Sequence, residues 1–504
     1  MSPETGVARA ITSLRAGRLD DAEQALRKVL RQQKRHAGAL NLLGVLLTRR
    51  GRFGEAAKCM EAAIEAGCAS DATFYNYGIV LKALGRPASA VDQFTRALAT
   101  NDTLWDTWNA RGAAFNDLRR YADAIADFDR AIALNPKAAA AHSNKGNSLT
   151  ALREFDDARA AFEIALALNP NLAGAWAGRG RLLFDLNDYD AADVAFERAI
   201  ALEPDLAFAW LERGNLLTAR NRPEDAIHCF RRAQQAAPEL AEAHFAEAFC
   251  RLKFGDAAEG WKKYEWRGGV DKIGGSFDKP LWLGDRPISG KSILLHSEQG
   301  FGDTIQFCRF VKSVSDLSAS VTLEVQPELK SLLEKLPGPD RLMARGEPRP
   351  AYDLHCPLGS LPLALRIDPE RLDPAPYLSA PPVRVEEWRL RLDRLERPRI
   401  GIAWAGNPSF RSDHNRSIGL MRLLPAVSAT PARFISVQKN ASDDDKSLLR
   451  TNGILDYESH IGDFVDTAAL MSCLDLVISS DTSVVHLAGA LGTKVWVLLR
   501  YDAD

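Results

Sequence analysis

The sequence of 504 residues is poor in the features that mark several large classes of protein. It has 7 cysteines, none in a CxxC pair, so neither a disulfide framework nor a thiol-based zinc site is indicated. Its 9 histidines form no HExxH motif, so we expect no metal. There is no run of about 18 apolar residues, the length that a membrane-spanning helix requires, so we expect no integral contact with a membrane.

The sequence also lacks an excess of charge of either sign. Lys and Arg number 64 against 66 Asp and Glu, which gives a formal net charge of −2 at pH 7. No strong field therefore favours nucleic acid or an acidic membrane. With 46% hydrophobic residues, the chain has enough apolar side chains for a core. Because its first residues contain no apolar stretch of signal-peptide type and its thiols are expected to be free, we expect a cytoplasmic protein.

What the first half does contain is a period of 34 residues. One glycine recurs six times at this spacing: Gly44, Gly78, Gly112, Gly146, Gly180 and Gly214. Each glycine is followed by two alanines with a large apolar residue between them: Met60, Phe94, Phe128, Phe162, Phe196 and Phe230. The last four units close on a proline: Pro136, Pro170, Pro204 and Pro238.

This spacing predicts pairs of antiparallel helices. Small residues let the two helices of a pair approach, the large apolar residue fills the groove between them, and proline ends the second helix. The pattern resembles tetratricopeptide repeats, whose 34-residue unit it matches six times in phase. Weaker copies precede the six units, at Ala10 and Ala22, and follow them, from Ala248. We therefore expect an α-solenoid over residues 1–266.

A solenoid of this kind leaves one face free for peptides or other proteins. Just before the repeated glycine, four successive units carry a basic residue: Arg111, Lys145, Arg179 and Arg213. These side chains either line a groove that binds an acidic partner or lay their stems along the packing between repeats with their charges in water. The asparagine ladder found in the repeats of O-linked N-acetylglucosamine transferases is mostly missing, since only Asn76 and Asn144 occupy its position.

Beyond residue 266 the helical period ends. Residues 267–290 are rich in Gly, Pro and Asp and are predicted to be a linker. Short β-branched runs then alternate with helical stretches: SILLH, VTLEV, RIGIAW, FISVQ, DLVIS and VWVLL. This alternation predicts parallel sheets of the α/β class. A break near PAPYLSAPPVRVEEW divides the region into two Rossmann-like halves, 291–383 and 384–504.

The first candidate site follows the first of these strands. Gln299, Gly300 and Gly302 precede Asp303 in a loop at the carboxyl end of the strand, where open α/β sheets bind ligands. Asp303 either caps the helix that begins here or acts as the base that takes a proton from an acceptor hydroxyl.

The second candidate site follows the strand DLVIS. Asp481, Thr482 and Ser483 lead into a helix that carries His486. Backbone N–H groups at the start of such a helix suit a diphosphate, Asp481 suits a sugar or ribose hydroxyl, and His486 suits a phosphate. The alternative is a capped helix with a core histidine.

Together these segments resemble bacterial ADP-heptose:lipopolysaccharide heptosyltransferases. The resemblance rests on EQGFGDTIQFCRF, RIGIAWAGNPSFRSDHNRSIGL and DFVDTAALMSCLDLVISSDTSVVHLAGALGTKVWVLL, and it covers most of residues 291–500. It implies a two-Rossmann glycosyltransferase fold of B type and an inverting, metal-independent transfer without a cofactor, with Asp303 as the catalytic base. It also implies that the following residues bind the nucleotide-sugar donor: Trp404, Asn407, Arg416, Asp481, Thr482, Ser483 and His486.

The order of repeats and α/β segments also resembles bacterial repeat-bearing glycosyltransferases, some of them linked to protein glycosylation. This resemblance implies a protein acceptor held by the repeats. Two alternatives stay open, namely transfer to a saccharide or lipid-linked glycan, and a non-catalytic repeat scaffold with a degenerate transferase domain. The scaffold gains support from the chain's end at VWVLLRYDAD, because resembling proteins continue for several dozen residues; we expect the second half to be incomplete.

Overall fold

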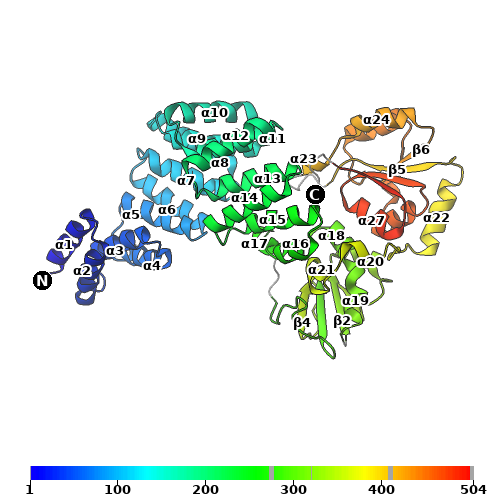
Figure 1. The fold of residues 1–504 in the computed structure, drawn as a ribbon, viewed down its shortest axis with the longest axis horizontal. Helices are drawn as coiled ribbons and strands as arrows, with labels where there is room; N and C mark the ends of the chain where they lie inside the picture. The colour runs from blue at the N-terminus through cyan, green and yellow to red at the C-terminus, as the bar shows by residue number, and fades with distance from the viewer. Residues whose placement is uncertain (1, 272–276, 319, 407–412, 500–504) are drawn as a thin grey trace. The chain divides into compact units, whose positions relative to one another are not determined.

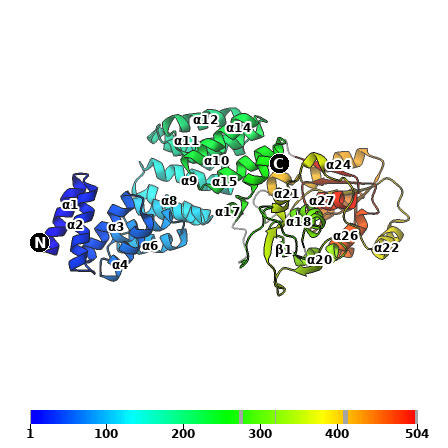
Figure 2. The same ribbon diagram turned by 60° about the horizontal axis from the view of Figure 1, so that its bottom comes forward.

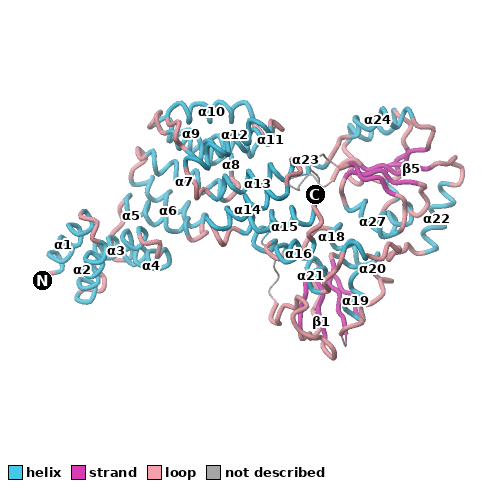
Figure 3. Tube along the Cα trace, viewed as in Figure 1, coloured by secondary structure: helices cyan, strands magenta, loops and turns pink. Residues whose placement is uncertain are grey.

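The computed structural model describes residues 2–271, 277–318, 320–406 and 413–499. Helices alone make up the first half of the chain, and helices alternate with strands in the second (Figures 1 and 3). The chain divides into two compact units, Met1–Leu216 and Leu217–Asp504.

The first unit consists of helical hairpins. Its helices are α1 (Pro3–Arg15), α2 (Leu19–Gln32), α3 (Ala37–Arg49), α4 (Phe53–Glu65), α5 (Asp71–Ala83), α6 (Pro87–Thr100), α7 (Trp105–Asp117), α8 (Tyr121–Leu134), α9 (Ala139–Leu152), α10 (Phe155–Leu168), α11 (Ala173–Asp185) and α12 (Tyr189–Leu202). Helix α13 (Ala207–Ala219) begins in this unit and ends in the next. The period of 34 residues is therefore a helix pair, as the sequence predicts.

The repeated glycine lies against the repeated aromatic side chain of its own hairpin. A Cβ atom on Gly112 would lie 2.6 Å from a ring carbon of Phe128, and one on Gly78 would lie 2.5 Å from Phe94. Only glycine permits so close an approach, and the aromatic ring that fills the space is fully buried in each case. Burying such a side chain stabilises the hairpin by about 1.5–3 kcal/mol.

A second contact recurs where one hairpin follows another. The indole N–H of Trp176 donates to the carbonyl oxygen of Pro170 at 2.8 Å, and His142 Nε2 lies 3.2 Å from the same oxygen of Pro136. Both prolines lie just beyond a helix end, so each contact ties the turn after one hairpin to the first helix of the next. Histidine takes the place of tryptophan here because its Nε2 can present an N–H in the same position.

The second unit begins with the last helices of the repeat array, α14 (Pro223–Ala236), α15 (Ala241–Lys253), α16 (Ala257–Tyr264) and α17 (Arg267–Asp271). One buried carboxylate joins three of them. Glu247, whose side chain is 1% exposed, accepts hydrogen bonds from Gln234 of α14 at 2.7 Å and Arg251 of α15 at 2.7 Å. It also forms an ion pair with Lys263 of α16 at 2.9 Å. The repeat pattern therefore runs on into this unit.

Two parallel sheets follow. The first has the strand order β3-β2-β1-β4, and its strands are β1 (Ser292–His296), β2 (Ser320–Val325), β3 (Arg341–Ala344) and β4 (Leu354–Pro357). The second has the order β7-β6-β5-β8-β9, and its strands are β5 (Arg399–Ala403), β6 (Arg433–Ser436), β7 (Leu455–Asp456), β8 (Leu476–Ser480) and β9 (Val495–Leu498). In register, Leu295 pairs with Leu323 in the first sheet and Ile402 with Ile478 in the second.

Short helices connect the strands and cover the sheets. They are α18 (Phe301–Phe307), η1 (Cys308–Phe310), α19 (Val311–Ser315), α20 (Pro327–Leu333), η2 (Leu358–Ser360), α21 (Leu361–Ala364), η3 (Pro369–Arg371), α22 (Pro382–Leu392), α23 (Asp413–Arg416), α24 (Leu420–Ala429), α25 (Asp443–Thr451), η4 (Glu458–His460), α26 (Phe464–Met471) and α27 (Ser483–Leu491). Buried residues such as Leu323, Leu361 and Trp388 form the core between these layers.

An α/β region with parallel sheets is thus confirmed, and all six predicted strands are present. The sequence missed β3, β4 and β7, which have only two to four residues and lack a β-branched run. The predicted linker 267–290 is also more ordered than its composition suggests. It starts in α17, and further along Leu281 pairs with His355 while Trp282 is buried. The assembly of the two sheets as a B-type glycosyltransferase stays a prediction.

Candidate active site

Both predicted site loops lie where the strand order of a sheet reverses. This reversal falls between β1 and β4 in the first sheet and between β5 and β8 in the second. In open α/β sheets, the loops at the carboxyl ends of such strands form a crevice that binds ligands. The loop that contains Asp303 follows β1, and the loop Asp481–Ser483 follows β8.

The two loops meet within the second unit. Helix α18, which carries Asp303, packs against helix α27, which carries His486 (Figures 1 and 2). The two helices approach closely at Gly302, where a Cβ atom would lie 2.7 Å from Cδ2 of His486. A side chain at this position would push the two helices apart. The loop that contains Asp303 and the helix that carries His486 therefore lie side by side, although they come from two separate sequence motifs.

Asp303 lies in the first turn of α18. Its Oδ2 accepts a hydrogen bond from the backbone N–H of Gly300, the N-cap residue, at 2.9 Å. Burial raises the pKa of Asp303, the Gly300 hydrogen bond and His486 oppose this rise, and the Asp481 carboxylate adds to it. A carboxylate whose pKa is moved toward neutrality is a stronger base when ionised. The two roles that the sequence left open are compatible in this geometry.

His486 sits between the two carboxylates. Its Nε2 lies 4.0 Å from Oδ1 of Asp481. Burial lowers the pKa of His486, although the charges of Asp481 and Asp303 oppose the effect. The imidazole is therefore mainly neutral at neutral pH, so it can donate one hydrogen bond and accept another.

The N-terminus of α27 has no side-chain cap. Thr482 is the N-cap residue, but its side chain accepts no hydrogen bond from the first turn; its hydroxyl lies 3.4 Å from that of Ser479. The neighbouring Ser480 hydroxyl is buried, and the part of the chain that the structure describes offers it no partner. Backbone N–H groups at such a helix start attract anions.

Residues that the sequence did not suggest hold the loop of Asp303 in place. Gln326, just after β2, donates to the carbonyl oxygen of Gln299 at 2.9 Å and accepts from Thr304 at 2.9 Å. Arg345, just after β3, donates to the carbonyl oxygen of Ser297 at 2.6 Å. Both follow strands of the same sheet, but neither lies in a motif that sequence reasoning could have singled out.

The end of the repeat array also contacts this loop. The Tyr264 hydroxyl donates to Oε1 of Gln299 at 3.0 Å, and Arg267 forms an ion pair with Glu298 at 2.9 Å. Burial raises the pKa of Tyr264 to about 12, and the charge of Asp303 adds to the rise. The phenol thus stays protonated and keeps its role as donor.

The other residues predicted to bind the donor are placed differently. Trp404 is 1% exposed and belongs to the core of the second sheet, where its indole N–H donates to Asp445 at 3.2 Å. Trp404 therefore packs in this core, and its contact with a donor stays a prediction. Arg416 is partly exposed and pairs with Asp413 at 3.0 Å. Asn407 lies outside the described residues.

The predicted basic stripe is largely neutralised by carboxylates of the repeats themselves. Arg111 pairs with Asp127 at 2.8 Å, Lys145 with Asp129 at 2.6 Å, and Arg213 with Asp193 at 2.8 Å and also with Glu197. The Arg179 guanidinium lies over the ring of Trp176, 5.6 Å from its centroid. These contacts favour the structural alternative over a groove that binds an acidic partner.

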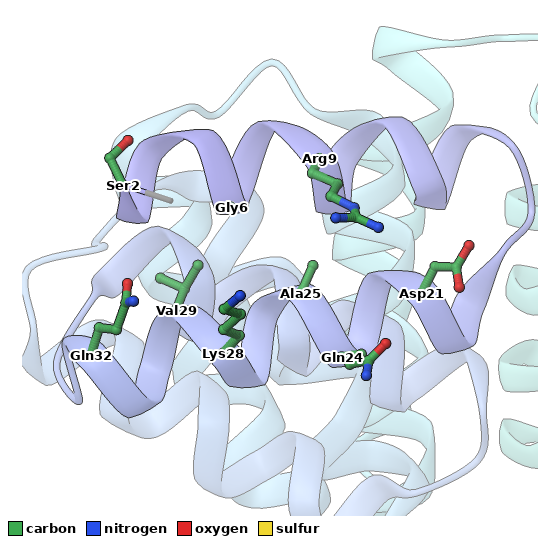
Figure 4. Close-up of a pocket in the computed structure, with 9 residues that line it drawn as sticks. All are labelled: Ser2, Gly6, Arg9, Asp21, Gln24, Ala25, Lys28, Val29 and Gln32. Atoms are coloured by element: carbon green, nitrogen blue, oxygen red, sulfur yellow. The ribbon is translucent and has the colours of Figure 1, made fainter.

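A separate pocket of about 200 Å³ lies between α1 and α2 and contains none of the predicted site residues (Figure 4). It is lined by Ser2, Gly6, Arg9, Asp21, Gln24, Ala25, Lys28, Val29 and Gln32. Over the ranges that the structure describes, no three His, Cys, Asp or Glu side chains are grouped to hold a metal ion. Within the same ranges, the helices are too short or too polar to cross a membrane.

Comparison with known proteins supports the repeats. The family profile described as "Tetratricopeptide repeat" matches residues 7–72, 75–139, 109–173, 143–207, 177–241 and 211–260, together half of the chain. Protein FlbA of Caulobacter vibrioides is 25% identical over 283 residues, which is 50% of this chain and 47% of FlbA. The chain thus spans about half the length of that relative.

Two solved structures are similar to parts of the chain. A tetratricopeptide repeat protein from Parabacteroides merdae is 20% identical, with a TM-score of 0.45, and the match covers 49% of this chain and 98% of that one. Yeast Tom70 is 19% identical, with a TM-score of 0.40, and covers 54% and 61% of the two chains.

Proposed function

Since the chain belongs to the tetratricopeptide-repeat family, we propose that its repeats hold a protein partner and that its α/β region transfers a sugar from a nucleotide sugar to that partner. The observation that carries the catalytic half is the close approach of Gly302 to His486. It brings a carboxylate with a raised pKa, Asp303, together with His486 and with the uncapped start of α27. A base beside an anion site is what glycosyl transfer to a hydroxyl requires.

The proposed chemistry follows from this pairing. Asp303 takes the proton of the acceptor hydroxyl while the hydroxyl oxygen forms a bond to the anomeric carbon of the sugar. The bond from that carbon to the diphosphate oxygen breaks on the opposite face, which inverts the configuration. The departing diphosphate keeps the electron pair, and its charge is stabilised by the N-terminus of α27. Asp303 then returns its proton to solvent.

The test of the base is the variant Asp303→Asn. We expect transfer to fall by about 10²- to 10⁴-fold, the usual contribution of a general base. The matched control is Asp316→Asn, an exposed aspartate of the same region whose carboxylate pairs with Lys312. The measurement is mass spectrometry of proteins that co-purify with the full chain, incubated with UDP-, GDP- and ADP-sugars, to detect an added glycan. Undiminished transfer by Asp303→Asn contradicts the assignment.

A non-catalytic scaffold is the second candidate. The family match favours it, because that match covers the repeats and ends at residue 260. The two functions differ in whether the uncapped start of α27 binds a diphosphate. Calorimetry of the full chain with UDP, GDP and ADP separates them, since a scaffold binds none of the three. Glycan transfer to a saccharide, with no modified protein, would support the enzyme but contradict the protein acceptor.

A further inference from the structure

One arginine at the end of the repeat array is buried among the elements of the candidate site. Arg267 opens α17 and is 3% exposed. All five of its N–H donors have acceptors. Nε and Nη2 donate to Oε1 of Glu298 at 3.2 and 2.9 Å, Nη2 also donates to Ser360 at 2.7 Å, and Nη1 donates to Glu265 at 2.9 Å and to the carbonyl oxygen of Tyr264 at 3.3 Å. A planar guanidinium can satisfy this set and an ammonium cannot.

Glu298 depends on this arginine. Its Oε1 accepts both bonds from Arg267 and a third from the backbone N–H of Gly359 at 3.2 Å. Its Oε2 is buried, and among the described residues it has no hydrogen-bond partner. Burial raises the pKa of Glu298, and Arg267 and the Gly359 N–H oppose this rise. A buried carboxylate that loses its ion-pair partner is strongly unfavourable, so removal of Arg267 favours displacement or protonation of Glu298. Among the described residues, the side-chain hydrogen bonds of Glu298 come from Arg267 and Gly359 and none from its own loop.

A series of hydrogen bonds and peptide units connects Arg267 with Asp303. Tyr264 binds Gln299, the residue after Glu298, so α16 and α17 together hold two successive loop residues. The next residue is Gly300, whose N–H binds the Asp303 carboxylate. Every link in this path from Arg267 to Asp303 is a hydrogen bond or a single peptide unit.

We propose that Arg267 is a positioning residue for Asp303, so that the last helix of the repeat array orients the base of the transfer site. This inference rests on the proposed function for its meaning in catalysis. The orientation itself does not depend on a donor or an acceptor and is measured without either.

The first measurement is hydrogen exchange of the full chain over residues 297–303. In Arg267→Ala we expect the Gly300 amide to exchange roughly tenfold faster, because its hydrogen bond to Asp303 is weakened. Glu298→Gln keeps a carbonyl oxygen for Arg267 and Gly359, so we expect exchange close to that of the unaltered chain. Arg286→Ala is the matched control, since Arg286 is exposed and pairs with its neighbour Asp285.

The second measurement is the NMR titration of the His486 ring in chain labelled at histidine and assigned with His486→Gln. The groups that face this ring are Asp303 and Gly302 of α18 and Asp481 of its own loop. The Asp303 charge raises the pKa of His486, so displacement of Asp303 in Arg267→Ala lowers it, as Asp303→Asn also does. A loss of packing elsewhere would not move this titration.

If Arg267→Ala does not fold, both measurements are made on Arg267→Lys. We expect the exchange of Gly300 and the pKa of His486 to change in the same directions by a smaller amount. Unchanged exchange and an unchanged His486 titration in the folded variant overturn the proposal. A chain that transfers no sugar but shows both changes leaves the positioning intact and contradicts only the proposed function. If the chain transfers sugar but Arg267→Ala changes neither the exchange of Gly300 nor the titration of His486, the proposed function stands and the positioning role of Arg267 is contradicted.

Discussion

In the repeats, the same contact between a glycine and a large apolar side chain recurs within successive hairpins, as between Gly112 and Phe128. In the α/β region, buried contacts join residues far apart in the sequence, such as Arg267 with Ser360 or Gly302 with His486. The core of the repeats is therefore formed by one short-range contact that recurs in successive hairpins. The α/β region builds its core and its candidate site from contacts that each occur once.

This difference has a physical consequence. A repeat contacts mainly its neighbours, so damage to one repeat stays near it and the stability of the array is a sum of similar terms. Strands that pair across a sheet depend on one another, so damage to one is shared by the whole unit. The predictions that follow test this contrast, beginning with the largest expected effect.

Phe128→Ala should lower the free energy of unfolding by about 3–5 kcal/mol, because it leaves a cavity where a fully buried ring was. We expect urea to unfold the repeats at a lower concentration while the transition of the α/β region stays in place, as followed by circular dichroism. Phe208→Ala, at a residue that is 40% exposed, is the matched control. A common shift of both transitions would contradict the contrast.

Glu247→Gln should destabilise the second unit by about 1.5–3 kcal/mol at pH 7, because hydrogen bonds to charged groups are lost. Burial opposes ionisation of Glu247, but its hydrogen bonds from Gln234, Lys263 and Arg251 hold the pKa below its usual value of 4.5. Its stabilisation is therefore complete above about pH 4.5 and is lost as the pH falls through the lowered folded pKa. Thermal unfolding of both proteins between pH 3 and 7 should show the two curves converging in acid.

Asp303→Asn should raise the stability of the folded chain, in contrast to Glu247→Gln. Because burial raises the pKa of Asp303, the folded chain holds this proton more tightly than the unfolded chain, and stability falls as the pH rises from 3.8 through the raised value. Asparagine removes this penalty, so we expect a gain of about 1 kcal/mol at pH 7.5, the common size of a stabilising substitution. The gain should vanish near pH 3 in calorimetric melting. A loss of stability at pH 7.5 would mean that the hydrogen bond from Gly300 to the ionised carboxylate outweighs the cost of burying its charge.

Trp176→Phe should cost about 0.5–1.5 kcal/mol, because it removes the hydrogen bond to Pro170 but keeps most of the apolar surface. The effect should be confined to the unfolding of the repeats in urea. Trp496→Phe is the control, since Trp496 is 64% exposed in the edge strand β9. Equal effects of the two substitutions would show that the hydrogen bond contributes nothing.

The contrast also explains what the sequence could predict. Gly78 and Phe94 predict their own contact, because their spacing recurs and the recurrence has one physical meaning. The loop around Asp303 and the helix start at Ser483 were predicted from local signals, namely glycines and small polar residues after a strand. That the two segments share one site was implied by the resemblance alone, and the contact of Gly302 with His486 was not predicted, because it depends on how two sheets pack.

Other parts of the site gave no local signal at all. Arg267 lies at the start of a stretch whose glycines predict a linker, yet it is buried by partners as distant as Glu298 and Ser360. Trp404 follows a strand, and the resemblance implies that it binds the donor, but nothing in its own segment indicates that Asp445 lies within reach of the indole. Burial is a property of the whole fold, and it decides the role of both side chains.

The repeated pair of glycine and aromatic ring also bears on how such a chain changes over generations. Because Phe94, Phe128 and Phe162 meet equivalent glycines, two neighbouring hairpins present nearly the same surfaces to each other. A duplication or loss of 34 residues would therefore join surfaces that already fit. The array can therefore lengthen or shorten in whole steps, while the α/β region that follows is left untouched.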